Sequence, residues 1–372
     1  MKKILWISES PLTNSSYGLV SHELCRRIGK NHEVHILSKN YVGKPLSTDN
    51  YFLHPFEDFG SLFRIKNSLN PDFIVWLADL LSMKEILNLD LGNSKFIPYF
   101  PCDSVQLLPG SKEILQKAYK RVAISKFTKE VAKKEGFDSQ VIYHGVDTNI
   151  FKPTHVEKSK FGIENDKFVF LSLGRNTQRK ILSRLIHCFN EFSKDKEDVV
   201  LILRTNPIAK DSNLVEFTNY RFPNLFSEKK LFFSEQFLLE PVTYEFLNDL
   251  YNISDAYIST SCGEGFGIPY IEAMACKKPI IAPNFSTTEE LILDELEGIG
   301  ARGIGTKIIT VVTDMINYVD HGLCDIEDTV NAMNRIYEDK SLRDKMGENG
   351  MRFVKKFCDW DKISEQWLEV LD

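Results

Sequence analysis

The chain has 372 residues, more than one hydrophobic core usually supports, so its length predicts two domains. Hydrophobic residues make up 43% of it and charged residues 26%, which excludes a disordered or collagen-like chain. The formal net charge of -6 excludes a general attraction to nucleic acid, for which a local basic patch would be needed.

Two features of the sequence predict a cytoplasmic location. The seven cysteines include no CxxC pair, which suits a reducing compartment, where they would serve as small core residues. The chain begins MKKILWISESPL, in which the apolar stretch is too short for a signal peptide or a membrane span.

Short apolar runs alternate with amphipathic stretches along nearly the whole chain, as in βα units that build a parallel sheet. The strands predicted in the first half are residues 4–8, 33–37, 73–77, 96–100, 122–125 and 140–143. Those predicted in the second half are residues 168–173, 199–204, 230–233, 256–259, 279–282 and 308–312. This order predicts two open α/β sheets in tandem.

Ligands of open parallel sheets bind beside the carboxyl ends of the strands, so the loops that follow the strands are where we expect chemistry. The first such loop, residues 8–18 (SESPLTNSSYG), is small and polar, and Gly18 would allow a ligand to approach the backbone closely. It lacks GxGxxG, which argues against a dinucleotide-binding domain at this point. An ordinary turn is the alternative for Ser15 and Ser16.

A basic segment lies between Lys112 and Lys134, where there are eight Lys or Arg residues and only two Glu. It is either the solvated face of two helices or a surface for anionic lipid or acidic glycan. The second reading predicts a peripheral membrane contact.

The domain boundary is predicted in residues 144–153 (HGVDTNIFKP), where Gly145 and Pro153 interrupt the periodicity. We therefore assign residues 1–152 to an N-terminal domain and 153–356 to a C-terminal domain. The last helix, about 357–372, is assigned to the first domain, although it could as easily cover the second.

A second loop of interest, residues 170–181 (FLSLGRNTQRKI), has Arg175 and Lys180 at its two ends. Two fixed cations at a helix N-terminus can stabilise a departing diphosphate without a metal. The alternative is a solvated basic turn, because Arg179 and Arg184 lie beside them.

The strongest signal is residues 261–283 (SCGEGFGIPYIEAMACKKPIIAP), which follow a predicted strand and run into a helix. Glu264 precedes that helix and Glu272 lies in its early turns, so the two carboxylates suit a polyol ligand. The turn after the first carboxylate consists of Gly265, Phe266 and Gly267, whose backbone N–H groups could donate to sugar hydroxyls or phosphate oxygens. Alternatively, Glu272 favours the helix dipole and the glycines only make the turn.

These residues resemble a known family. The segment GEGFGIPYIEAMACKKPIIA is similar to the ExxxxxxxE donor-binding motif of glycosyltransferase family four, the group one glycosyl transferases, and the similarity extends to most of the chain. The resemblance implies the GT-B fold, an α/β architecture in which two Rossmann-like, doubly wound domains face each other across a cleft.

The resemblance also implies roles for residues of the C-terminal domain. Glu264 would contact the donor sugar, and Glu272 would bind the ribose of the nucleotide. Arg175 and Lys180, in the pattern G-R-x4-K, resemble the pyrophosphate-binding pair of the family. The nucleotide base is expected near residues 236–239.

The N-terminal half departs from the family pattern in two places. Gly18 matches a glycine turn near the donor phosphate, but many relatives have two adjacent glycines where this chain has Tyr17 and Gly18. Many members also have a histidine under the donor sugar, and residues 96–105 (FIPYFPCDSV) contain none. Asp103 could replace it by accepting a sugar hydroxyl or by stabilising positive charge on the sugar, or it could be a helix or turn cap.

The resemblance predicts a retaining glycosyltransferase that moves a hexose from a nucleotide diphospho-sugar, of the GDP-mannose or UDP-glucose type, to a hydroxyl of a glycan, lipid or other acceptor. The alternatives are a GT-B sugar-nucleotide epimerase or phosphorylase and a catalytically silent GT-B binding module. In the DxD triplet 359–361, Asp361 is expected to be an N-cap and Trp360 a packing anchor. No metal or other cofactor is therefore predicted.

Overall fold

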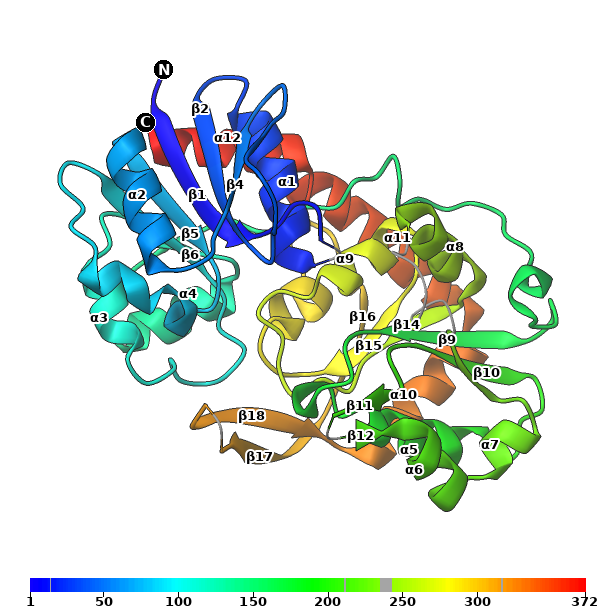
Figure 1. Cartoon of the computed structure of the whole chain (residues 1–372). Helices are drawn as coiled ribbons and strands as arrows, with labels where there is room; N and C mark the ends of the chain where they lie inside the picture. The colour runs from blue at the N-terminus through cyan, green and yellow to red at the C-terminus, as the bar shows by residue number, and fades with distance from the viewer. Residues whose placement is uncertain (14, 211, 235–242, 316) are drawn as a thin grey trace. The chain divides into compact units, whose positions relative to one another are not determined.

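The computed structural model describes residues 1–13, 15–210, 212–234, 243–315 and 317–372 (Figure 1). The chain forms two compact units. Unit 1 comprises Met1–Gly145, Asp314–Val319 and Phe357–Asp372, and unit 2 comprises Val146–Thr313 and Asp320–Lys356.

Unit 1 is built on an eight-stranded sheet in the order β3-β4-β2-β1-β5-β6-β7-β8. The strands are β1 (Lys3–Glu9), β2 (Glu33–Lys39), β3 (Leu46–Ser47), β4 (Phe52–Pro55), β5 (Phe73–Leu77), β6 (Lys95–Phe100), β7 (Val122–Ala123) and β8 (Gln140–Val141). All neighbouring strands are parallel except β3 and β4. Strand β2 lies on one side of β1, whereas the strands from β5 to β8 follow one another on its other side. The topological switch point therefore lies between β1 and β5.

Helices cover both faces of this sheet, which explains why its central strands are almost continuously hydrophobic. One face packs against α2 (Phe59–Leu69), the 3₁₀ helix Leu80–Asn88, α3 (Ser111–Gln116) and α4 (Lys126–Lys134), with Leu5, Ile7 and Trp76 in the shared core. The opposite face packs against α1 (Ser16–Ile28) and α12 (Trp360–Leu371).

The terminal helix α12 is anchored in the core of unit 1 by Trp367, which is fully buried. Its ring lies 5.3 Å from that of Trp6 and 5.0 Å from that of Tyr99. At the start of the helix, the carboxylate of Asp361 accepts a hydrogen bond from Arg27 of α1 at 2.6 Å. The two ends of the chain thus share one core.

Unit 2 has a parallel six-stranded sheet in the order β13-β10-β9-β14-β15-β16. Its strands are β9 (Phe168–Leu173), β10 (Val199–Arg204), β13 (Leu231–Phe233), β14 (Ala256–Ile258), β15 (Ile280–Pro283) and β16 (Gly303–Thr306). Two pairs lie outside it: β11 (Ile208–Ala209) with β12 (Ser212–Asn213), and β17 (Ile308–Asp314) with β18 (Val319–Cys324). The switch point of this sheet lies between β9 and β14.

The helices of unit 2 are α5 (Leu182–Ser193), α6 (Leu214–Arg221), α7 (Asn224–Ser227), α8 (Tyr244–Ile253), α9 (Ile268–Ala275), α10 (Ile326–Glu338) and α11 (Lys340–Phe357). Short 3₁₀ helices span Lys158–Phe161 and Gln178–Lys180, and a π-helix spans Glu289–Leu293. One core cluster is formed by hydrophobic residues of β9, β10, α5 and α10, among them Phe170, Phe189 and Met333.

The structure differs from the sequence prediction at two places in unit 2. The run 308–312 was predicted to belong to the main sheet, but it forms the small pair β17–β18, where Val311 and Val312 are exposed. The outer strand of the main sheet is instead β16, whose sequence GIGT has two glycines and therefore little strand signal.

The boundary between the units falls at Gly145–Val146, within the predicted segment 144–153. The residues of this segment that follow the boundary pack on α8 of unit 2. The ring of Phe151 lies 5.9 Å from that of Tyr251, and the backbone N–H of Lys152 donates to Asn248 at 3.0 Å.

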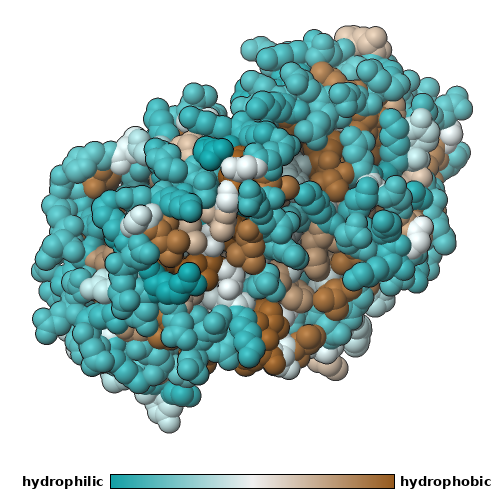
Figure 2. Space-filling model, turned by 180° about the vertical axis from the view of Figure 1, so that it is seen from behind, coloured by the Kyte–Doolittle hydropathy of each residue, from teal (hydrophilic) through white to brown (hydrophobic). Residues whose placement is uncertain are grey.

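Hydrophilic residues dominate the face of the molecule drawn in Figure 2, and the hydrophobic residues on it form separate groups. Among the described residues, no helix combines the length and the apolar composition needed to cross a membrane.

Candidate functional site

The switch point of unit 2 brings two of the predicted loops together. Strand β9 pairs in parallel with β14, with Phe170 opposite Ala256 and Leu171 opposite Tyr257. The loop after β9 and the loop after β14 therefore leave the sheet at the same edge. The first contains Arg175 and Lys180, and the second contains Glu264.

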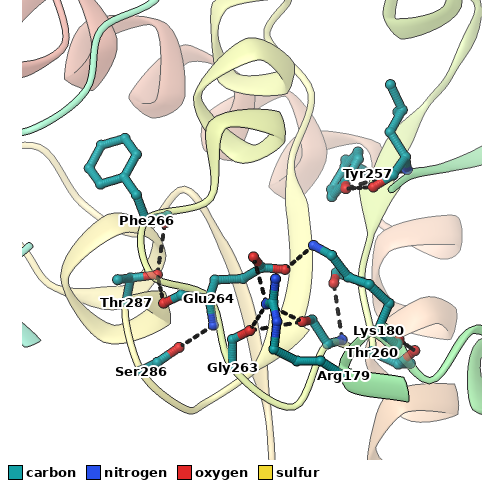
Figure 3. Close-up of polar contacts among 12 residues, drawn as sticks. Arg179, Lys180, Tyr257, Thr260, Gly263, Glu264, Phe266, Ser286 and Thr287 are labelled. Atoms are coloured by element: carbon teal, nitrogen blue, oxygen red, sulfur yellow. Dashed lines mark hydrogen bonds and ion pairs between the residues drawn. The ribbon is translucent and has the colours of Figure 1, made fainter. Parts of the chain in front are cut away.

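An ion-pair cluster joins these two loops (Figure 3). Lys180 Nζ forms an ion pair with Oε1 of Glu264, and Arg179 Nη1 lies 3.1 Å from Oε2 of the same carboxylate. Burial of Glu264 opposes its ionisation, but the charges of Lys180 and Arg179 outweigh that effect and lower its pKa to about 2. The carboxylate is therefore ionised at neutral pH and held by two cations.

The structure places the two predicted cations differently. Burial lowers the pKa of Lys180 despite the opposing effect of Glu264, and the charges of Arg179 and Arg175 lower it further. Arg175 thus lies close enough to influence Lys180, but its side chain is exposed and makes no hydrogen bond or ion pair within the described residues.

Arg179 is the functional candidate that sequence reasoning missed. It was weighed only as a sign of a solvated basic turn, yet its guanidinium also donates to Ser261 Oγ at 3.3 Å and to the carbonyl of Gly263. Arg184, the other cation near this turn, donates to the carbonyl of Cys324 at 2.7 Å, a contact that links α5 to the end of β18. The adjacency of Arg179 to Lys180 was the available signal.

The turn that carries Glu264 is held by the loop after β15. The backbone N–H of Glu264 donates to Ser286 Oγ at 2.8 Å, and Thr287 Oγ1 donates to the carbonyl of Phe266 at 2.8 Å. Sequence reasoning gave no role to Ser286 or Thr287. Their hydroxyls fix the backbone of the turn and so the direction of the carboxylate.

The small-residue turn before α9 has the glycine geometry that its sequence suggested. Gly267 has φ +103, and a Cβ there would lie 2.5 Å from the ring of Tyr270, so a side chain is excluded. The N–H groups of Gly265 and Gly267 donate to none of the residues that the structure describes. Phe266 is buried, and in Figure 3 its ring points away from the Glu264–Lys180 pair.

Glu272 lies in α9 in a different environment. It is buried, and Tyr251 donates its hydroxyl to Oε2 at 2.7 Å. Burial raises the pKa of Glu272 to about 7, although the Tyr251 hydrogen bond and the positive charge of Arg204 act in the opposite direction. Burial is the main cause that raises the pKa of Tyr257, and the charges of Glu264 and Glu272 raise it further. The two carboxylates therefore lie near the same phenol.

In unit 1, the residues around Gly18 form an ordinary helix start. Ser15 is the N-cap of α1, and its side chain accepts from the N–H of Gly18 at 3.0 Å. A Cβ on Gly18 would lie 2.2 Å from the carbonyl oxygen of Ser10. Residue 18 must therefore be glycine, because any side chain would collide with the loop that precedes α1.

Asp103 follows β6 and is half-buried. It lines a hollow at the carboxyl edge of the unit 1 sheet together with Asp79, Cys102 and Ser111. The next helix, α3, has Gly110 as its N-cap, so Asp103 does not cap that helix.

The expectation for the DxD triplet was partly wrong. The N-cap of α12 is Asp359, whose side chain accepts from the N–H groups of Asp361 and Lys362, because the helix begins two residues earlier than predicted. Asp361 instead pairs with Arg27. Trp360 is buried, as predicted, and occupies the space where Gly145 would carry a Cβ.

Most of the basic segment from Lys112 to Lys134 is engaged in contacts within unit 1. The contacts are Lys112 with Glu135, Lys117 with the carbonyls of Ile86, Leu87 and Leu89, Lys120 with the carbonyl of Val370, Arg121 with the carbonyl of Leu115, and Lys129 with Asp138. These cations stabilise the fold. Residues 236–239, expected near the nucleotide base, lie outside the described residues.

The sequence matches the family described as "Glycosyl transferases group 1" over residues 154–301. A probable sucrose-phosphate synthase of Thermosipho melanesiensis is 33% identical over 236 residues, which cover 62% of this chain and 47% of that protein. The chain spans about half the length of such curated relatives.

Solved structures resemble the whole chain. Sucrose-phosphate synthase from Thermosynechococcus elongatus gives a TM-score of 0.79 at 16% identity, covering 100% of this chain and 98% of that one. HepE of Anabaena, solved with UDP and glucose, gives 0.75 at 17% identity, covering 100% and 99%. The chain therefore has the GT-B fold, and its residues 154–301 match the group 1 glycosyl transferase family.

Proposed function

We propose that the protein transfers a hexose from a nucleotide diphospho-sugar to a hydroxyl acceptor, with the donor bound at the switch point of unit 2. The observation that supports this most strongly is the cluster of Lys180, Arg179 and Glu264. In it, two cations are fixed beside a carboxylate at the place where open α/β sheets bind ligands.

Each group in the cluster has a chemical role in this proposal. Lys180 and Arg179, with the exposed Arg175 beside them, would stabilise the negative charge that develops on the departing diphosphate. Glu264 is ionised and would accept hydrogen bonds from hydroxyls of the donor sugar. Glu272 would accept from ribose hydroxyls in place of Tyr251.

We propose that the configuration at the anomeric carbon is retained, through front-face attack in which the leaving phosphate helps to accept the proton of the acceptor. Because two or three cations can serve the diphosphate, we propose that transfer requires no metal. Activity should therefore persist in EDTA. We also propose that Asp103 takes the place of the family histidine and stabilises positive charge on the sugar during transfer.

The donor is proposed to be UDP-glucose or GDP-mannose. The binding of UDP and glucose by HepE supports the first of these as the initial substrate to examine. A cytoplasmic location and a peripheral membrane contact stay predictions of the sequence.

The proposal is tested by incubating pure protein with each donor and a panel of hydroxyl acceptors, then separating the products. Transfer gives nucleoside diphosphate and a new glycoside with the donor's anomeric configuration. An epimerised donor, or a free sugar phosphate, would instead indicate an epimerase or a phosphorylase. Absence of any donor turnover would indicate a binding module.

A further inference from the structure

Tyr257 on β14 lies at the centre of a row of three buried tyrosines in unit 2. Its ring lies 6.2 Å from that of Tyr251 on α8 and 5.8 Å from that of Tyr270 on α9. Tyr257 is only 2% exposed, so a ligand at the nearby loops would touch its neighbours and not the phenol itself. Any effect of this residue on the site must therefore act through other residues.

The hydroxyl of Tyr257 holds the end of strand β9 (Figure 3). It donates to the carbonyl of Leu173 at 3.1 Å and accepts from the N–H of the same residue at 3.4 Å. The ladder between β9 and β14 ends at the pair Leu171–Tyr257, so the phenol joins the two strands beyond the end of their ladder. Burial raises the pKa of Tyr257, and the nearby carboxylates raise it further, so the hydroxyl keeps its proton and remains a donor.

The backbone held in this way supports the side chain of Lys180. Gly174 follows Leu173 directly, and its N–H donates to the carbonyl of Arg204 on β10 at 3.2 Å. A Cβ on Gly174 would lie 3.4 Å from Cε and 3.8 Å from Nζ of Lys180, so the lysine side chain lies against this glycine. From there its ammonium group reaches the carboxylate of Glu264. The end of β9 is thus bonded to both neighbouring strands and forms the surface against which the lysine packs.

We propose that Tyr257 is a positioning residue for binding of the donor diphosphate and that it acts through Lys180. The inference rests on the proposed function. The phenol fixes the end of β9, the end of β9 supports the lysine side chain, and the lysine presents its ammonium group to the diphosphate. Tyr257→Phe keeps the ring and its packing but removes the hydroxyl, so Leu173 loses both of its bonds to the phenol.

Calorimetric titration of the full chain with the favoured nucleoside diphosphate, UDP or GDP, and with its monophosphate measures this role. We expect Tyr257→Phe to weaken diphosphate binding about fivefold and monophosphate binding less than about twofold, as the loss of a hydrogen bond at the phosphate end of the site would. Because the tyrosine acts through the lysine, the double variant with Lys180→Ala should bind no more weakly than Lys180→Ala alone.

Tyr99→Phe is the matched control for the loss of a buried phenol. Tyr99 is fully buried in unit 1, and its hydroxyl also donates to backbone carbonyls, those of Ile142 at 3.1 Å and Tyr143 at 3.3 Å. Both variants should lower the melting temperature by a similar amount, but only Tyr257→Phe should weaken diphosphate binding. Similar losses of diphosphate affinity in the two variants would show a general effect of stability and would overturn the proposal.

Acetylation by acetic anhydride, followed by peptide mass spectrometry, reports the position of Lys180 without any ligand. Tyr257→Phe should accelerate modification of Lys180 severalfold, because its ammonium group is released from Glu264, while the exposed Lys194 keeps its rate. An unchanged rate at Lys180, an unchanged diphosphate affinity, or losses that add in the double variant would overturn the positioning role. Faster modification in a protein that binds neither UDP nor GDP would support the positioning of Lys180 and contradict the proposed function instead.

Discussion

Two glutamates eight positions apart acquire opposite ionisation behaviour from their surroundings. Glu264 lies between Lys180 and Arg179, so its pKa falls to about 2. Glu272 is equally enclosed but meets mainly the hydroxyl of Tyr251, so burial dominates and its pKa rises to about 7. Sequence spacing predicted the pair, but it could not predict that only one carboxylate would be matched by nearby cations.

This difference predicts a pH-dependent effect of Glu272→Gln on stability. The folded pKa of about 7 exceeds the ordinary 4.5, so wild type loses stability as the pH rises from about 4.5 through 7. The amide does not ionise and avoids that loss, which amounts to about 3 kcal/mol at most. The melting temperature of the variant relative to wild type should therefore rise between pH 5 and pH 8. A difference that is constant with pH would contradict the assignment.

Replacement of Lys180 by alanine should lower kcat/KM by about 100-fold or more, corresponding to about 3 kcal/mol of transition-state stabilisation. Arg179→Ala should act in the same direction. Steady-state kinetics with the active donor provide the measurement, and Lys194→Ala, which removes an exposed partner of Glu191, is the matched control. Wild-type kinetics in both site variants would contradict the proposed roles.

The turn between β9 and α5 places the cations of the site. Ile181 in this turn has φ +41, a left-handed conformation that is unfavourable for a β-branched residue. Thr260, which follows β14, donates to the carbonyl oxygens of Lys180 at 3.3 Å and Ile181 at 3.1 Å. The N–H of Cys262 donates to the carbonyl of Arg179 at 2.9 Å. The segment that follows β14 thus holds the strained turn that follows the neighbouring strand β9.

Removal of the Thr260 hydroxyl should loosen this turn. We expect Thr260→Val to lower kcat/KM for transfer about tenfold, because a lost hydrogen bond of about 1 kcal/mol displaces Lys180. Thr260→Ser keeps the hydroxyl and should restore activity. Equal activity of the valine and serine variants would show that the hydrogen bond does not position the cations.

The order of the helices and strands along the chain could be predicted from the sequence more readily than the pairing of the strands. Strong apolar runs such as 73–77 and 168–173 coincide with β5 and β9. Periodicity does not state which strand pairs with which, so the run 308–312 was placed in the wrong sheet. The contact of Arg179 with Glu264 joins residues 85 positions apart and depends on that pairing.

Across the whole molecule, the C-terminal helix completes the core of unit 1. Trp367 packs between Trp6 and Tyr99, so Trp367→Ala should destabilise unit 1 by about 3–5 kcal/mol. Hydrogen exchange should accelerate in peptides from β1 and β6, while those from β9 and β14 stay protected. An equal acceleration of hydrogen exchange in both units would contradict the claim that each unit has its own core.

The sequence predicted two α/β units and the loops that would contain polar residues, because hydrophobic periodicity and strand ends are local properties. The hollow lined by Asp79 and Ser111 could not be predicted, since it arises from loops that meet only after the sheet has formed. The boundary between the units lies within the predicted segment 144–153, but its exact place in that segment could not be predicted, because the packing of Phe151 on α8 leaves no local signal.

Calorimetric titration with UDP and GDP tests the central claim most directly, because it requires neither the acceptor nor turnover. We predict that the favoured nucleoside diphosphate binds to wild type and to Lys194→Ala with equal affinity. Lys180→Ala should bind it at least tenfold more weakly, and the loss should be smaller for the matching monophosphate. Unchanged diphosphate affinity in Lys180→Ala would contradict the claim that this cluster holds the donor.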